Sequence, residues 1–103
     1  MGLLNRRSSG PAQKVEKEIT IINRLGLHAR AAAQLVRLAS GFQSKIKLIR
    51  TDNSVIADAK SILSVLTLAA AKGVELELEI QGDDAERAFE AVREIFNNGF
   101  GEL

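Results

Sequence analysis

The chain has 103 residues and a net charge of +1, with 14 lysine and arginine residues against 13 aspartate and glutamate residues. This length suits one domain with a modest core, and the charge balance gives no electrostatic case for a nucleic-acid partner. One histidine and no cysteine exclude disulfides, thiolate nucleophiles and histidine-rich metal sites within one chain, so we expect no metal and no cofactor.

Residues 1–14 contain the only proline and show no periodicity, which predicts a flexible N-terminal extension, with the domain at residues 15–103. No segment approaches the roughly 20 apolar residues of a membrane span or resembles a secretory signal, so we expect a cytoplasmic protein without membrane insertion. Val15 to Ile22 alternates in polarity and predicts a strand. From Ala29 the apolar residues follow helical spacing until Gly41, which is typical of a helix end.

Two strands are predicted next, from Lys45 to Arg50 and from Val55 to Ala59, with a turn at Asp52-Asn53 between them. A second helix is predicted from Ser61 to Ala71, ending near Gly73.

Val74 to Ile80 alternates apolar residues with glutamates and predicts a strand with one face in water. Asp83 followed by Glu86 resembles a capping box, and the last predicted helix then ends at Asn98-Gly99. The order is βαββαβα, with strands too short and too alternating for a doubly wound sheet. An α+β fold with a four-stranded antiparallel sheet and three helices on one face is the simplest packing.

His28, the only histidine, stands where the first predicted strand has ended and the first helix begins. Since none of serine, threonine, aspartate or asparagine stands immediately before this helix, His28 is the expected N-cap, beside backbone N–H groups that lack intrahelical partners. The positive end of the helix favours the neutral form of the ring, whose nitrogen can attack an electrophile. The same helix end can then stabilise an anionic phosphoryl group on the ring. An ordinary surface histidine that caps a helix is the alternative, and residue type alone favours it.

Two further residues are open to a functional and a plain interpretation. Arg30 places a positive charge at a helix start, which a nearby anion would favour, although solvation would also suffice. Ser61 is first of all an N-cap, but phosphorylation there would add negative charge at the start of the second helix.

Apolar residues occupy most of the circumference of the second predicted helix, which is more than a single buried face requires. Either some of them are exposed and suit the docking of a partner, or the helix is short and thoroughly buried. The pattern favours neither alternative.

Two separated motifs match a known family. The run from Asn23 to Arg30 (Asn-Arg-Leu-Gly-Leu-His-Ala-Arg) resembles the active-site signature of HPr, the histidine-containing phosphocarrier of the bacterial phosphoenolpyruvate-dependent phosphotransferase system. Lys60 to Leu63 (Lys-Ser-Ile-Leu) is similar to the signature around the family's regulatory serine. The resemblance covers roughly residues 15–100, with the spacing between the two motifs intact.

The resemblance implies a phosphocarrier, a phosphoryl-transfer intermediate rather than a stand-alone catalyst. Enzyme I would phosphorylate Nδ1 of His28, Arg30 would stabilise the phosphate, and an enzyme II A-type component would receive the group, for sugar uptake or its regulation. Ser61 matches the position modified by HPr kinase/phosphorylase. The apolar residues Ile62, Leu63 and Leu66 correspond to the docking patch. The family fold is an open-faced β-sandwich with strand order 1-4-2-3, and we expect a monomer.

The chain departs from the family pattern at two helix positions. Ala31 stands where the family usually has proline, which predicts looser pre-organisation of the site. Ala69 stands where glycine is common, a change that concerns the end of the second helix. The ending from Ile95 to Phe100 resembles the nitrogen-related branch of the family, whose carriers serve regulation.

Two other functions are compatible with parts of the sequence. A Ser61-controlled effector that carries no phosphoryl group is one, although relatives of that kind lack the histidine. A small-ligand module of the ACT type shares a βαββαβ order but gives no reason for Arg30 to stand near His28.

Overall fold

The structure is a computed structural model that describes residues 13–102. In chain order its elements are β1 (Gln13–Thr20), α2 (Ala29–Ala39), β2 (Lys45–Arg50), β3 (Ile56–Asp58), α3 (Ile62–Leu66), β4 (Glu75–Gly82), α4 (Ala85–Asn97) and a 3₁₀ turn, η1 (Gly99–Gly101). The predicted βαββαβα order is confirmed. β1 begins two residues before its predicted start, and residues 1–12 of the predicted extension lie outside the described residues.

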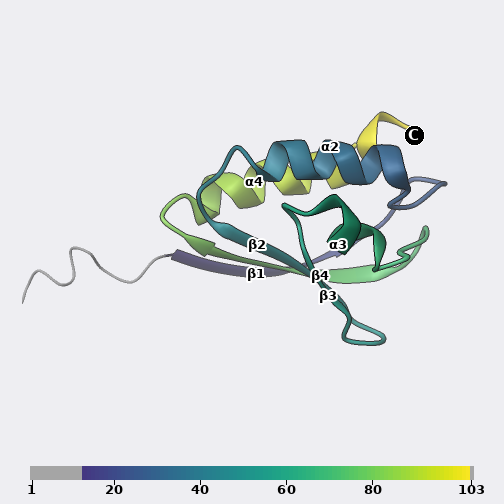
Figure 1. Cartoon of the computed structure of the whole chain (residues 1–103), viewed down its shortest axis with the longest axis horizontal. Helices are drawn as coiled ribbons and strands as arrows, with labels where there is room; N and C mark the ends of the chain where they lie inside the picture. Colours follow the sequence, from purple (N-terminus) through teal and green to yellow (C-terminus); the bar gives the residue numbers. More distant parts are fainter. Residues whose placement is uncertain (1–12, 103) are drawn as a thin grey trace, which may run out of the picture.

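All strand pairs are antiparallel, and the sheet order is β1-β4-β2-β3, which confirms the predicted topology. The helices lie on one side of the sheet, with α2 and α4 side by side above it and α3 smaller beside them (Figure 1). The start of α2 and the end of α4 lie at the same end of the molecule (Figure 1). The core between the two layers is apolar, and its largest fully buried side chains include Phe96, Ile21, Leu35, Ile46, Leu48, Leu76, Leu78 and Ile80.

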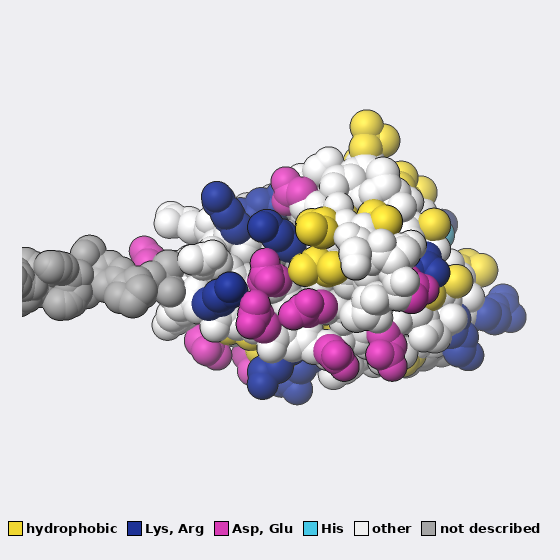
Figure 2. Space-filling view, turned by 90° about the horizontal axis from the view of Figure 1, so that it is seen from below, with side chains coloured by type: hydrophobic (Ala, Val, Ile, Leu, Met, Phe, Trp, Pro, Cys, Tyr) yellow, Lys and Arg dark blue, Asp and Glu magenta, His cyan; other side chains and the backbone are white. Residues whose placement is uncertain are grey.

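The other face of the sheet is open and acidic. The register places Glu16 opposite Glu79 and Glu18 opposite Glu77, so like charges face each other across β1 and β4. Figure 2 shows acidic side chains gathered on this face. Like charges directly opposite each other are unfavourable in a sheet, and Lys47, whose Nζ lies 4.0 Å from Glu79 Oε1, offsets part of the repulsion.

The predicted length of the second helix is wrong, because α3 ends at Leu66. Thr67 is its C-cap, and at Ala69 the backbone adopts φ 48°, which turns the chain out of the helix. This turn lets Leu68 and Ala70 bury their side chains in the core. Arg50 holds the turned segment in place by donating from Nη1 to the carbonyls of Leu68 and Ala69 at 2.9 and 3.0 Å.

The predicted capping box at Asp83 and Glu86 is also wrong. The N-cap of α4 is Asp84, and its side chain makes no capping hydrogen bond to its own helix. The carboxylate instead accepts hydrogen bonds from the N–H groups of Gln43 and Ser44 at 2.9 and 3.0 Å and from Ser44 Oγ at 2.5 Å. It therefore ties the loop after α2 to the loop before α4, a contact that no local pattern predicts.

These hydrogen bonds, that of the Ser44 hydroxyl first, lower the pKa of Asp84 from 3.8 to about 2. Because the folded-state pKa is the lower one, the stabilisation is fully present above about pH 4 and is lost as the pH falls toward 2. We expect Asp84→Asn to lower the melting temperature at pH 7 by several degrees and to lose less further stability between pH 4 and 2 than the wild type. Thermal melts followed by circular dichroism across this pH range measure both effects.

Asp83→Asn is the matched control for this experiment, since it removes an exposed neighbouring carboxylate that makes none of these three bonds. Equal acid sensitivity of Asp84→Asn and Asp83→Asn would show that the bonds to Ser44 and Gln43 contribute nothing to acid stability.

Candidate functional site

His28 is the N-cap of α2, as predicted. Its backbone is extended (φ −73°, ψ 178°), and its carbonyl accepts the first helical hydrogen bond, from Ala32 N at 2.8 Å. The imidazole ring is turned toward the first turn of α2, where Nδ1 accepts a hydrogen bond from the Arg30 N–H at 3.2 Å. Nδ1 therefore points at a backbone donor of the first turn, and only a quarter of the side chain (26%) is exposed.

The other ring nitrogen contacts a carboxylate from the far end of the chain. His28 Nε2 lies 2.5 Å from Oε2 of Glu102, a residue 74 positions away. Because Nδ1 accepts a hydrogen bond, the neutral ring carries its hydrogen on Nε2, which then donates to Glu102. In Figure 1 the C-terminal segment lies beside the start of α2, which agrees with this contact.

Asn23 links this carboxylate to the loop that carries His28. The Asn23 side chain is buried, and its Nδ2 donates to the Gly26 carbonyl at 2.8 Å and to Glu102 Oε1 at 2.9 Å. The hydrogen bond from Asn23 is the main reason why the pKa of Glu102 is lowered; His28 and Arg30 add to the shift, and burial opposes it. Glu102 is thus held as a carboxylate between an amide and an imidazole.

Gly26 sets the path of the loop before His28. Its φ is +68°, and a Cβ at this position would lie 2.5 Å from the Ala70 carbonyl oxygen and 2.8 Å from Ala71 Cα. The next residue, Leu27, is buried and donates its N–H to the same Ala70 carbonyl at 2.9 Å. The loop therefore lies directly against the segment after α3, and this contact fixes where α2 begins.

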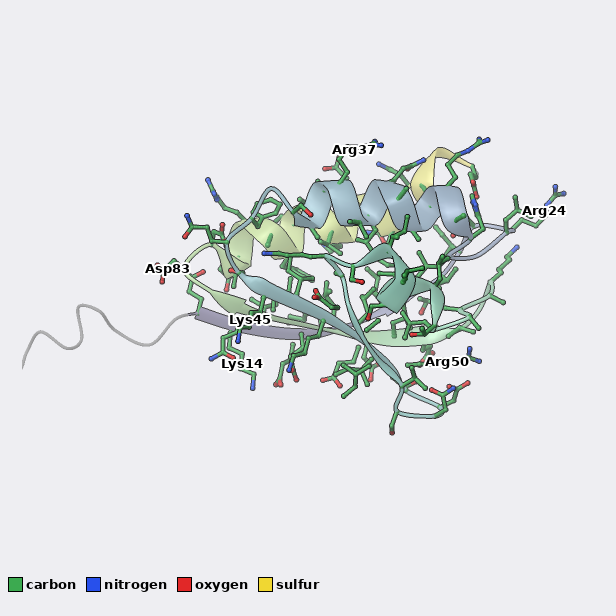
Figure 3. The ribbon with its side chains drawn as sticks, viewed as in Figure 1. Lys14, Arg24, Arg37, Lys45, Arg50 and Asp83 are labelled. Carbon is green, nitrogen blue, oxygen red and sulfur yellow. The ribbon has the colours of Figure 1, made fainter. Side chains whose placement is uncertain are left out.

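Positive side chains line a cavity beside Glu102, the carboxylate that contacts His28. Arg24, Arg30 and Lys72 line a shallow open cavity of about 640 Å³ together with Ile22, Leu25 and Glu102. Arg24 extends outward from the loop before α2 (Figure 3). No carboxylate of residues 13–102 forms an ion pair with any of these three cations. An anion held at His28 would therefore lie near unneutralised positive charge.

Ser61 and the apolar residues of α3 form a second group on the same helical layer. Ser61 is the N-cap of α3, with Oγ accepting from Ser64 N at 3.3 Å, so its predicted capping role is confirmed. Ile62, Leu63 and Leu66 are exposed, Leu63 by 74%. Part of the apolar surface of this helix is therefore exposed, and the alternative of a thoroughly buried helix is wrong. We call Ile62, Leu63 and Leu66 the α3 patch; it lies on a helix that packs against α2.

Sequence reasoning assigned no contact in the site to Asn23 and did not consider Glu102 at all. Glu102 is remote from His28 in sequence and belongs to no motif, so no local signal could have found it. Among residues 13–102, the acidic group close enough to hold a metal ion is Glu16, Glu77 and Glu79. It lies on the open sheet face, where the strand register already accounts for it.

This open-faced α+β sandwich, with its histidine at the start of α2, has the fold and the histidine position that the resemblance to the histidine-containing phosphocarriers implies. Comparison of the sequence with known protein families leads to the same class. Residues 15–98 match the PTS-HPr family, described as the PTS HPr component phosphorylation site. The chain therefore belongs to the HPr family of phosphotransferase-system phosphocarriers.

Individual relatives match most of the chain. The phosphocarrier protein HPr of Cupriavidus necator is 46% identical over 88 residues, which cover 85% of this chain and 97% of that protein. The phosphocarrier protein NPr of Escherichia coli is 41% identical over 88 residues, with the same coverage of both chains. The crystal structure of HPr-C-His from Thermoanaerobacter tengcongensis is 37% identical with a TM-score of 0.81, covering 86% of this chain and 98% of that one. No helix within residues 13–102 is long and apolar enough to cross a bilayer.

Proposed function

We propose that His28 accepts a phosphoryl group from enzyme I on Nδ1 and donates it to an enzyme II A-type component. The observation that carries this proposal is the orientation of the ring, with Nδ1 turned toward the Arg30 N–H in the first turn of α2 and the hydrogen placed on Nε2. A lone pair on Nδ1 is what attack on phosphorus requires. Once Nδ1 is phosphorylated, the phosphoryl oxygens take its place as acceptors of hydrogen bonds from the adjacent N–H groups.

The chemical step needs a nucleophile and charge stabilisation, and the site contains residues suited to both. Nδ1 forms the new N–P bond while the bond between phosphorus and the donor histidine of enzyme I breaks. The Arg30 N–H, released from Nδ1, then donates to a phosphoryl oxygen. The exposed Arg30 guanidinium can reach the same group and neutralise its charge, and the positive end of α2 adds to this effect.

The test is a transfer assay with purified enzyme I and phosphoenolpyruvate. Intact-mass spectrometry should show one added phosphoryl group per chain, lost in acid as expected for phosphohistidine and retained in base. Fragmentation should locate it at His28. With enzyme I shown to phosphorylate another carrier in the same mixture, absence of the added group would refute the proposal.

The acceptor can belong to sugar uptake or to the nitrogen-related branch, because relatives named HPr and NPr resemble the chain at 46% and 41% identity. Presenting the phosphorylated chain to an enzyme II A component of each branch distinguishes the two, since the natural acceptor should discharge His28 much faster.

We also propose that partners dock on the α3 patch, because it combines exposed apolar side chains with contact to the helix that His28 caps. Leu63→Asp should raise the KM of enzyme I for this carrier about tenfold or more, since a charge would have to be buried in the interface. The fold should persist, because Leu63 is outside the core. Transfer rates measured against carrier concentration give this value.

Ile56→Asp is the matched control. Ile56 is 59% exposed, but it lies on β3 rather than on the α3 patch, so its substitution should leave KM unchanged. An equal rise of KM in both variants would place docking elsewhere.

Ser61 supports a second proposal, that HPr kinase/phosphorylase modifies it and that the chain then acts as a regulatory effector. Its hydroxyl is half-buried at the start of α3, directly before the α3 patch. A phosphate there would add negative charge beside apolar docking residues. Effector binding that needs the kinase and survives loss of His28 would support this function as an independent one.

A further inference from the structure

We infer that Glu102 is a positioning residue for the phosphoryl transfer: it fixes the hydrogen of the His28 ring on Nε2 and balances the positive charge of the phosphorylated ring. This inference rests on the proposed phosphocarrier function and adds to it a residue outside both motifs. Three features support it, namely the contact itself, the anchoring of the C-terminal segment and the charge balance of the reaction.

The first feature is that both oxygens of Glu102 are engaged. Oε2 lies 2.5 Å from His28 Nε2, and Oε1 accepts from the buried Asn23 Nδ2 at 2.9 Å. Asn23 in turn binds the Gly26 carbonyl, so the carboxylate is oriented by the loop that leads to His28. Only 20% of the Glu102 side chain is exposed. A carboxylate held in this way orients an imidazole much as buried carboxylates do beside other reactive histidines.

The second feature is that Glu102 does not belong to a loose chain end. Phe100 is buried and packs edge-on against Phe96 of α4, with ring centroids 4.9 Å apart. Gly99, Phe100 and Gly101 all have positive φ, which folds the chain back toward the start of α2. The Glu102 N–H donates to the Gly99 carbonyl at 2.9 Å. The core thus places this carboxylate at the ring.

The third feature is the charge balance. A neutral ring with its hydrogen on Nε2 attacks through the Nδ1 lone pair, and the donor N–P bond breaks as the new one forms. No proton leaves in this step, so the phosphorylated ring becomes cationic. Glu102 lies against the Nε2–H and compensates that charge. In the onward step the N–P bond breaks again and the ring departs as a neutral imidazole, which is a good leaving group.

A purely structural role for Glu102 would have a different signature. It would change stability but not the position of the ring hydrogen. The chain is suited to this distinction, since its single histidine gives one set of imidazole ¹⁵N signals. The ¹⁵N chemical shifts of Nδ1 and Nε2 report the tautomer directly, without enzyme I.

The experiment compares wild type, Glu102→Ala and Glu102→Gln in the full chain, with Glu94→Gln as the control that removes an exposed carboxylate of α4. We expect the wild type and Glu94→Gln to hold the Nε2–H tautomer. Glu102→Ala should populate the Nδ1–H form appreciably and slow phosphoryl transfer from enzyme I by about tenfold or more. In Glu102→Gln the charge is lost, so the pH profile of phosphoryl loss should move to lower pH.

The outcomes separate this inference from the proposed function. If the wild type accepts the phosphoryl group but both Glu102 variants match Glu94→Gln in tautomer, transfer rate and pH profile, the inference is overturned and the phosphocarrier function stands. If the wild type accepts no group from active enzyme I, the proposed function is overturned, and this inference with it. Melting curves show whether each variant is folded at the assay temperature.

Discussion

The His28→Ala variant is expected to accept no phosphoryl group from enzyme I, a loss of at least about 1,000-fold relative to the wild type. The chain has no second histidine and no cysteine that could replace it as the nucleophile. The remaining donors, the first-turn N–H groups and Arg30, can hold a phosphate but cannot form a bond to phosphorus. Acid-labile phosphate, measured by intact mass after incubation with enzyme I and phosphoenolpyruvate, is the readout.

His28→Asn is the control that separates chemistry from folding. Since His28 is the N-cap of α2, alanine should also cost about 1 kcal/mol of stability. Asparagine is a good N-cap and has no nucleophilic nitrogen, so this variant should melt near the wild type and still accept no phosphate. A stable His28→Asn protein that gains an acid-labile group would contradict the assignment of His28.

The Gly26→Ala variant is expected to lose about 3 kcal/mol or more of unfolding free energy. Two costs add at this position, the positive φ of +68° and a Cβ that would lie 2.5 Å from the Ala70 carbonyl oxygen. The neighbouring group is backbone, so relief requires the loop to move away from the segment after α3. Because His28 follows two residues later, phosphoryl transfer should fall as well, even at temperatures where the variant is folded.

Gly73→Ala provides the matched comparison. Gly73 also has a positive φ, +90°, but a Cβ added there would have nothing within 4 Å of it. Its substitution should cost only the backbone strain, about 1 kcal/mol, and leave transfer unchanged. Urea unfolding of both variants measures the difference, and equal losses would show that the contact between Gly26 and Ala70 does not matter.

The secondary structure of the chain was largely predictable because its strands and helices are strongly periodic. β4 alternates glutamates with apolar residues from Glu75 to Ile80, and each apolar residue of this stretch is buried, as the pattern predicts. The helix α2 has its apolar residues at helical spacing and a polar face toward solvent. Local patterns of this kind depend only on which side of an element meets the core.

The errors arose where a distant contact outweighs a local preference. The apolar run after Ser61 favours a long helix, yet the burial of Leu68 and Ala70 turns the chain after Leu66. Asp84 leaves its own helix uncapped because Ser44 and Gln43 offer better partners. Propensities describe a residue and its neighbours, whereas the Asp84 carboxylate binds residues about 40 positions away.

The class of fold, the element order, the family resemblance and the position of His28 at a helix start follow from the amino-acid sequence alone. Periodicity and motif spacing carry that information locally, so they can be read without knowing what packs where. Which ring nitrogen faces the helix and which contacts a carboxylate depends on how the chain packs in three dimensions. Asn23, His28 and Glu102 come together because η1 folds back through Phe100, and contacts across more than 70 residues leave no periodic trace in a sequence.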